Sequence, residues 1–278
     1  MMDRLQVAFG RLQAQDLTGA ERLCREVLRD APGHRDALHL LGIVRLAGGN
    51  ADEAASLIGE ALAGGPRDAA MLENLGLAKL VQKNYAMAEG FFRDALALGA
   101  SHGLLYMRLG IALSSQGKLA DAAVMLREAA ARSPGVPDVH LNLGNTLGEL
   151  GALDEARACF EKVVALQPNH PAGHFNLGNL HRIMGRLQDA ETSCKRALAL
   201  MPNDAKTWRG RALSLERHGK LAEATSAYRD AIRLRPDDAD LRERLGAVLR
   251  RRHRDVEAAA AFRESLRLRP DAARAHHQ

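Results

Sequence analysis

The chain is poor in aromatic residues and has no long apolar run. Only 4% of its 278 residues are aromatic although 46% are hydrophobic, and the apolar content is mostly alanine and leucine. Both residues are strong helix formers, and their excess argues against a β-sandwich rich in Val, Ile and Tyr. Because no apolar run approaches about 18 residues, we expect no membrane-spanning segment. The N-terminal stretch MMDRLQVAFGRLQAQ also lacks the features of a signal peptide.

Cysteines are equally scarce. The three in the chain, Cys24, Cys159 and Cys194, lie far apart and form no Cys-x-x-Cys pair, which argues against a zinc site and against a disulfide framework. Cys24 and Cys194 are predicted to be small buried residues. Free cysteines favour a reducing compartment, and we therefore expect a cytoplasmic protein.

The usual signatures of catalysis are also missing. The eleven histidines form no His-Glu-x-x-His motif, and the chain contains no Gly-rich phosphate loop and no Gly-x-Ser-x-Gly. His140 and His174 share one place in a repeat with Tyr106 and Trp208, and we interpret them as packing residues. We predict that the chain is not an enzyme, with no catalytic residue, no metal and no cofactor.

What the sequence does contain is a unit of 34 residues repeated without insertion. Counted from Met1 in steps of 34, position 20 is alanine in all eight units, position 8 is glycine in six, and position 32 is proline in seven. An array of this kind grows by adding units rather than by enlarging one core. The predicted repeats end in a short tail, 273–278, and together form one solenoid, 1–272: 1–34, 35–68, 69–102, 103–136, 137–170, 171–204, 205–238 and 239–272.

Each unit divides into two helical patterns. The first runs to about position 14 and stops at a glycine such as Gly151 or Gly185, which suits the left-handed turn that closes a helix. The second runs from about position 18 to position 30 and ends before proline, which cannot continue a helix. We expect the glycine at position 8 and the alanine at position 20 to let the two helices approach closely, as with Gly144 and Ala156.

The spacing of Leu-Gly, Ala-x-x-x-Phe, Ala and Pro over 34 residues resembles the tetratricopeptide repeat family. The resemblance extends from residue 1 to about residue 272. It implies an all-α fold, a right-handed superhelical α-solenoid of helix-turn-helix units whose first helices line a concave groove. Repeat seven departs from the pattern, because Arg211 and Ala212 stand where Leu-Gly is usual.

The family's groove-facing positions are 2, 5, 6, 9, 12 and 13. In repeats one to three these positions are mainly apolar, with Leu5, Leu12, Leu40, Ile43, Leu46, Leu77 and Leu80. The predicted peptide-binding residues are mostly polar or basic: Asn74, Arg108, Asn142, Asn145, Phe175, Asn176, Asn179, Arg182, Lys206 and Arg209. An asparagine side chain carries both a donor and an acceptor, and can hold a peptide backbone without selecting its side chains.

Two narrower resemblances concern these asparagines. Asn142, Asn145, Asn176 and Asn179 resemble the asparagine ladder in the repeat domain of O-linked N-acetylglucosamine transferases, with breaks at Arg108 and Gly210. Asn145, Asn176 and Lys206 also match three of the five places of the carboxylate clamp of chaperone adaptors. The two other places of that clamp are occupied here by Leu141 and Gly210. An alternative is that these asparagines are simply solvated.

The positive charge of the chain is concentrated near its end. From Ala205 onward there are 18 Lys and Arg against 11 Asp and Glu, whereas the rest of the chain has 21 against 23. Lys206, Arg209, Arg217, Arg244, Arg250 and Arg251 make the groove basic there. The aromatic residues nearby lie at core positions, which disfavours nucleic-acid binding. An acidic peptide or protein partner fits this charge better.

We therefore predict a protein-protein interaction scaffold that binds an extended peptide or a partner protein in its groove. The opening of the chain weakly resembles bacterial chains in which such repeats precede a glycosyltransferase or sulfotransferase domain, so a substrate-recognition module is the alternative. The last helical pattern leaves Phe262, Leu266 and Leu268 to be buried. We expect either that the natural chain continues or that another molecule covers this face, as in a homo-oligomer formed through the uncapped C-terminal repeat.

Overall fold

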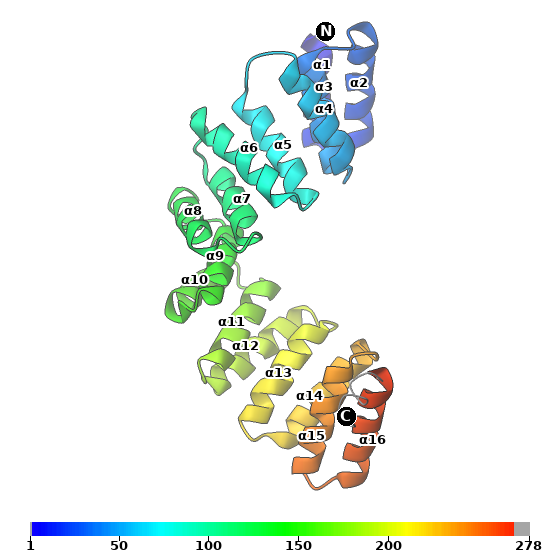
Figure 1. Cartoon of the computed structure of the whole chain (residues 1–278), viewed down its shortest axis with the longest axis vertical. Helices are drawn as coiled ribbons and strands as arrows, with labels where there is room; N and C mark the ends of the chain where they lie inside the picture. Colours follow the sequence, from blue (N-terminus) through cyan, green and yellow to red (C-terminus); the bar gives the residue numbers. More distant parts are fainter. Residues whose placement is uncertain (1, 270–278) are drawn as a thin grey trace, which may run out of the picture. The chain divides into compact units, whose positions relative to one another are not determined.

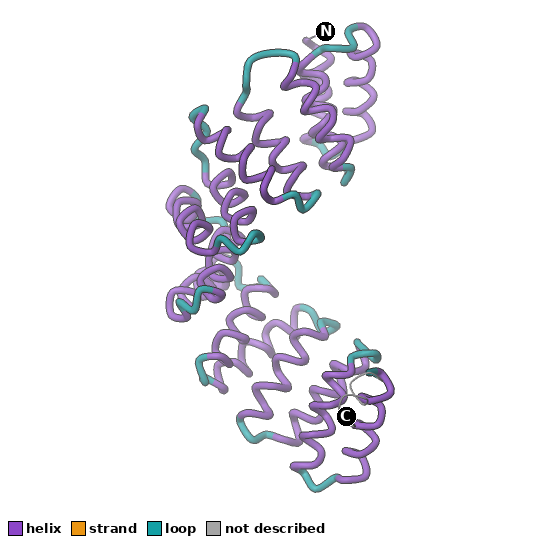
Figure 2. Tube along the Cα trace, viewed as in Figure 1, coloured by secondary structure: helices purple, strands orange, loops and turns teal. Residues whose placement is uncertain are grey.

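The computed structural model describes residues 2–269, and sixteen α-helices make up about four-fifths of this part of the chain (Figures 1 and 2). No strand occurs among these residues, as the composition predicted. The helices are α1 (Met2–Gln13), α2 (Leu17–Asp30), α3 (Arg35–Ala47), α4 (Ala51–Ala63), α5 (Ala69–Val81), α6 (Tyr85–Ala97), α7 (Gly103–Ser114), α8 (Leu119–Arg132), α9 (Pro137–Glu149), α10 (Leu153–Leu166), α11 (Pro171–Ile183), α12 (Leu187–Leu200), α13 (Ala205–Arg217), α14 (Leu221–Leu234), α15 (Ala239–Arg251) and α16 (Asp255–Leu268).

The helices fall into two compact units, divided between Pro134 and Gly135. The first unit holds α1 to α8 and the second α9 to α16, so each contains four of the predicted repeats. Within a unit, each odd-numbered helix packs against the even-numbered helix that follows it, and that helix packs against the next odd-numbered one. The predicted single solenoid over 1–272 remains a prediction, and the tail 273–278 lies outside the described residues.

The turn inside every repeat depends on one residue with a left-handed backbone. Position 15 has a positive φ in all eight repeats, and five of these residues are glycines, including Gly151 at 80° and Gly185 at 76°. The prediction of a left-handed closing turn is confirmed. Gln15, Lys83 and His253 adopt the same conformation with φ between 55° and 60°, although it is unfavourable for residues that carry a Cβ.

The small residue at position 8 makes room for the side chain at position 24 of the same repeat. A Cβ built on Gly144 would lie 2.6 Å from Cε1 of Phe160, and one on Gly76 would lie 2.7 Å from Cε1 of Phe92. The alanine at position 20 is almost completely buried throughout, with 0% exposure at Ala156 and 3% at Ala258. Close packing of the two helices is therefore what these small residues permit.

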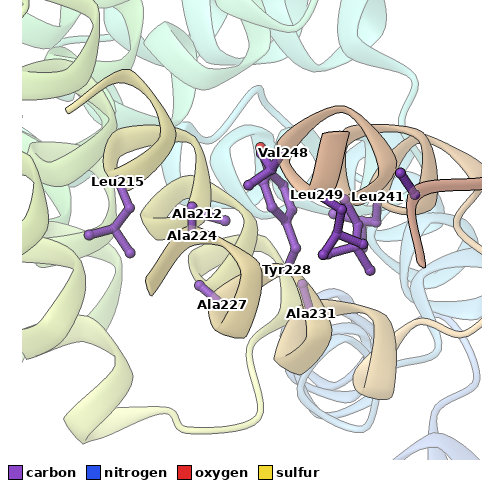
Figure 3. Close-up of a cluster of buried hydrophobic side chains, with 11 residues drawn as sticks. Ala212, Leu215, Ala224, Ala227, Tyr228, Ala231, Leu241, Val248 and Leu249 are labelled. Atoms are coloured by element: carbon purple, nitrogen blue, oxygen red, sulfur yellow. The ribbon is translucent and has the colours of Figure 1, made fainter. Parts of the chain in front are cut away.

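The core is built by stacking one repeat on the next, as the cluster in Figure 3 shows. Tyr228 of α14 is fully buried among alanines of its own repeat and Leu241, Val248 and Leu249 of α15. Cys24 and Cys194 are likewise buried, as predicted. One repeat alone could not cover these apolar surfaces, because part of each cluster comes from the neighbouring repeat.

Candidate binding cleft

The first helices of successive repeats also contact one another, α9 with α11 and α11 with α13. The predicted groove residues of the second unit therefore lie on helices that contact one another. Between α9 and α11 there is a cleft of about 370 Å³. Its lining contains three of the predicted asparagines, two glycines, one carboxylate and three apolar side chains: Asn145, Asn176, Asn179, Gly144, Gly148, Glu149, Phe160, Leu180 and Ile183.

Two of these asparagines hold each other in place. The side-chain amide of Asn176 donates to the side-chain carbonyl of Asn145, with 2.7 Å between the nitrogen and the oxygen. This bond uses one donor and one acceptor, so it does not engage the amide group of Asn145 or the carbonyl oxygen of Asn176. The pair thus presents a donor and an acceptor side by side, which is the pattern that a peptide group requires.

Asn179 lies on α11, one turn beyond Asn176, and its neighbour on α13 is Gly210. A Cβ built on Gly210 would lie 3.2 Å from Oδ1 of Asn179. The absence of a side chain at position 210 therefore gives the Asn179 amide room to stand beside α13. Gly210, which interrupts the asparagine pattern in the sequence, is the position that accommodates the asparagine of the preceding repeat.

Two other predicted residues of the second unit do not line the cleft. The amide of Asn142 donates to the backbone carbonyl of Asp138, one turn earlier in α9, at 2.8 Å. Phe175 is half-buried on α11 and is not among the lining residues. The structure thus brings together Asn145, Asn176 and Asn179, and leaves Asn142 bonded within its own helix.

In the first unit the two predicted polar residues already have partners. Asn74 on α5 is hydrogen-bonded to Nε2 of His39 on α3 at 3.0 Å. Arg108 on α7 forms an ion pair with Glu73 on α5 at 2.5 Å, and both side chains are largely buried. Burial lowers the pKa of Arg108, and Glu73 opposes that shift.

The predicted basic residues follow further along the same helices. Arg182 is half-buried on α11, whereas Lys206 and Arg209 are exposed on α13. Arg209 lines a second cavity, of about 590 Å³, together with Arg244. Lys206 and Arg209 also border a small recess of about 50 Å³.

The apolar zone predicted for repeats one to three is mostly taken up by packing. Leu40 has only 8% of its surface exposed and belongs to a core cluster with Cys24 and Leu41. Leu5 and Leu12 pack against the same cluster, and Leu46 and Leu80 pack against other clusters of the first unit. Leu40, which was predicted to face the groove, is buried instead, because the first repeat packs against it.

One recurring contact was not foreseen from the sequence. The ring nitrogen Nε2 of His174 donates to the carbonyl of Pro168 at 2.8 Å, and Nε1 of Trp208 donates to the carbonyl of Pro202 at the same distance. Arg242 makes the equivalent bond to the carbonyl of Pro236. These three side chains share position 4, and the only signal in the sequence was that each has an N–H donor six residues after a proline.

None of the helices within residues 2–269 combines the length and the apolar character needed to cross a membrane.

These observations define an all-helical repeat protein with a cleft between two of its first helices, lined by asparagines and apolar side chains. Family models described as tetratricopeptide repeat match residues 11–80, 113–177, 171–204 and 209–273, which together are most of the chain. The chain belongs to the tetratricopeptide repeat family. A comparison with the curated proteins finds no match.

Several solved structures share this fold. A chain described as MamA 41-end from Desulfovibrio magneticus RS-1 is 23% identical with a TM-score of 0.57, and the match covers 60% of this chain and 94% of that one. The pilF protein of Pseudomonas aeruginosa is 20% identical with a TM-score of 0.65, covering 74% and 93%. YrrB, described as a TPR protein with an unusual peptide-binding site, is 20% identical with a TM-score of 0.57, covering 66% and 95%. At these identities the likeness concerns the fold.

Proposed function

We propose that this protein is a non-catalytic interaction scaffold that holds an extended segment of a partner protein in the cleft between α9 and α11. Asn145, Asn176 and Asn179 would bond the backbone of that segment. The observation that carries the proposal is the Asn176–Asn145 hydrogen bond at the edge of a cleft with apolar walls. Membership of a repeat family, and the likeness to a structure described as having a peptide-binding site, support it.

The cleft suits a peptide for two physical reasons. The mutual bond fixes both amides before a ligand arrives, which reduces the entropy lost on binding. Leu180, Ile183 and Phe160 offer apolar surface beside these amides, so a side chain of the peptide can be buried while its backbone is bonded. Recognition of this kind is tolerant of sequence, because the amides bond groups common to every residue.

The remaining predicted residues have different places in this proposal. Asn142, Phe175 and Lys206 lie on α9, α11 and α13 outside the lining of the cleft, whereas Asn74 and Arg108 are engaged within the first unit. A cytoplasmic location, an acidic partner, self-association through the last repeat and a role as a recognition module for a transferase remain predictions. For the last repeat, Leu266 on α16 is 49% exposed, and light scattering of residues 1–278 over a concentration range would test self-association.

The experiment is a selection of 12-residue peptides from a displayed random library against residues 1–278, followed by calorimetric measurement of Kd. The double variant Asn145→Ala and Asn176→Ala should weaken the selected peptides by about fivefold to a hundredfold, since each net hydrogen bond contributes about 0.5–1.5 kcal/mol. N-methylation of one backbone amide of the peptide should be more damaging than replacement of the side chain beside it.

Asn203→Ala is the matched control, because Asn203 is exposed in the turn between α12 and α13. It should leave Kd unchanged. Selected peptides that bind the double variant and the wild type equally well would contradict the proposal, as would a library that yields no binder at micromolar concentration. Unchanged circular dichroism of the double variant would show that its fold is intact.

A further inference from the structure

First helices of neighbouring repeats place residues 35 apart against each other. In the first unit, Nδ2 of Asn74 lies 3.0 Å from Nε2 of His39, and Nη1 of Arg108 lies 2.5 Å from Oε1 of Glu73. In both pairs the residue at position 5 of one repeat meets the residue at position 6 of the next. The two partners are chemically complementary in each case.

The equivalent pair in repeats seven and eight is not complementary. Arg209 on α13 stands at position 5 and Arg244 on α15 at position 6, so both side chains of the pair are cationic. Both line the cavity of about 590 Å³, together with Leu213, Asp240, Glu243 and Ala247. At the position that corresponds to Glu73 there is a second arginine, and it lines the same cavity as Arg244.

Two further arginines adjoin this pair. Arg182 on α11 is half-buried, and its carbonyl accepts a bond from Nη1 of Arg217 at 3.2 Å. Its buried Nε has no hydrogen-bond partner within residues 2–269. Burial lowers the pKa of Arg182, and the charges of Arg217, Arg209 and Arg244 lower it further. The positive charges of the three other guanidinium groups therefore all act on Arg182. We call Arg182, Arg209, Arg217 and Arg244 the arginine cluster.

The nearby carboxylates do not balance this charge. Asp240 is paired with Arg269, and Glu216 accepts from Oη of Tyr228 at 2.7 Å and lies 3.6 Å from Arg251. Glu243 is the remaining acid on the cavity wall. Among the residues that the structure describes, none of the four arginines has a carboxylate within ion-pair distance, although Arg244 lies beside the hydroxyl group of Tyr228.

We propose that the arginine cluster is an oxyanion-binding subsite, which takes an acidic or phosphorylated side chain of the peptide held in the asparagine cleft. The assignment to a peptide rests on the proposed function. A guanidinium presents a planar fork of donors that matches a carboxylate or a phosphate. An anion at this position supplies what Glu73 supplies to Arg108, and relieves the repulsion among four like charges.

The cluster continues the asparagine cleft along the same face. Asn179 and Arg182 are neighbours one turn apart on α11, and Asn179 stands beside Gly210, the residue after Arg209. The cleft is lined by α9 and α11 and the cavity by α13 and α15, so the two sites follow one another in the order of the first helices.

The test uses the whole chain and three acetylated hexapeptides, of glutamine, of glutamate, and of alternating serine and phosphoserine. Kd is measured from chemical shifts of the arginine Nε–Hε groups at 0.15 M salt. The glutamate or phosphoserine peptide should bind at least about tenfold more tightly than the glutamine peptide, since hydrogen bonds to charged groups are the strong ones. Comparison of the two anionic peptides distinguishes carboxylate from phosphate as the natural group.

The double variant Arg209→Gln and Arg244→Gln should remove this preference. Its control, Arg196→Gln with Arg263→Gln, removes the same charge from exposed positions on α12 and α16 and should change Kd by less than about twofold at this salt concentration. Equal losses in both double variants, or no preference of the wild type for glutamate over glutamine, would overturn the subsite. Equally tight binding of a single-stranded DNA 12-mer would reduce it to general polyanion attraction, and would overturn it too.

A charge reversal provides a test in which a gain of stability is expected together with a loss of affinity. Arg209→Glu recreates the Glu73–Arg108 arrangement with Arg244, and should raise Tm while abolishing the preference for the glutamate peptide. The Asn145→Ala and Asn176→Ala variant separates this inference from the proposed function. Suppose that this variant binds the glutamate peptide with the wild-type Kd, and that the library-selected peptides bind it as tightly as they bind the wild type. The proposed function then fails, and the subsite stands. If selected peptides depend on the asparagines but not on the arginines, the subsite fails.

Discussion

Lys220, the residue that precedes α14, places its Nζ 2.8 Å from Oε2 of Glu191 on α12. The Glu191 side chain is only 3% exposed, and its other oxygen lies 2.7 Å from Nζ of Lys195. Burial by itself would raise the pKa of Glu191, but the hydrogen bonds from Lys195 and Lys220 outweigh it, and the pKa lies below its ordinary value. An ionised, buried carboxylate therefore joins repeats six and seven.

Lys220→Met should destabilise the fold by about 1–3 kcal/mol at neutral pH, because a buried charge loses a partner. The measurement is urea denaturation. Lys195→Met, which removes a more exposed partner in the same helix, should have the smaller effect. Because the pKa of Glu191 is lowered on folding, its contribution is present above an unfolded-state pKa of about 4.5 and is lost as pH falls. If Lys220→Met left the free energy of unfolding unchanged, Lys195 alone would be enough to compensate the charge of the carboxylate.

His181 should make stability depend on pH in the same direction, but at a higher pH. The side chain is 6% exposed, and within residues 2–269 neither ring nitrogen makes a hydrogen bond of good geometry, although the backbone of Asp189 lies close enough to oppose the pKa shift in part. Burial lowers its pKa, and the charge of Arg186 lowers it further. The unfolded chain therefore takes up a proton first, so stability should fall as pH drops below about 6.5 and level off below the folded-state pKa.

Denaturation of His181→Leu between pH 5 and pH 8 would check this effect. The difference in unfolding free energy between wild type and variant should change with pH below about 6.5 and stay constant above it. The corresponding variant at His218, an exposed residue that directly follows α13, serves as the comparison. Parallel pH curves for wild type and His181→Leu would contradict the prediction.

Two glycines on α9 should respond in opposite ways to alanine. A Cβ at Gly144 would come within 2.6 Å of the Phe160 ring, whereas one at Gly148 would meet no atom within 4 Å. Gly144→Ala should lower stability by about 1–3 kcal/mol through overpacking. Gly148→Ala should raise it by up to about 1 kcal/mol, because alanine favours a helix. Thermal unfolding of both variants checks the pair, and equal Tm values would refute the contact.

The left-handed position in the turn offers another pair of opposite changes. His253→Gly should stabilise the protein by about 1 kcal/mol, because His253 has a φ of 55° that glycine adopts without strain. Gly151→Ala, at a φ of 80°, should destabilise it by a similar amount. Urea denaturation of the two variants measures both effects. Stabilisation by Gly151→Ala would mean that the turn can change its conformation.

Much of the fold could be predicted because its determinants are local and periodic. Glycine at position 15, proline at position 32 and alanine at position 20 set the ends of the helices and the sides on which they touch, as Gly151 and Ala156 show. The burial of Cys24 and Cys194 followed from the same periodicity. Eight copies of one pattern make such an inference robust, since an error in one repeat is exposed by the other seven.

The candidate site was harder to predict, because its residues were identified by position in the repeat and not by their neighbours. Asn142 and Asn176 share position 6, yet the first bonds its own helix and the second bonds Asn145. Arg108 also stands at position 6, but Glu73 neutralises it. Leu40, at the same position, is covered by the neighbouring repeat.

By itself, the sequence determined that this protein is a series of helical hairpins, where each helix ends and which small residues allow the helices to touch. These properties depend on backbone preference and side-chain volume, which act within a few turns of chain. Only the tertiary structure decided which groove side chains remain available, because contacts 31 and 35 residues apart depend on how neighbouring first helices pack. That packing pairs Glu73 with Arg108 and places Arg209 and Arg244 at one cavity.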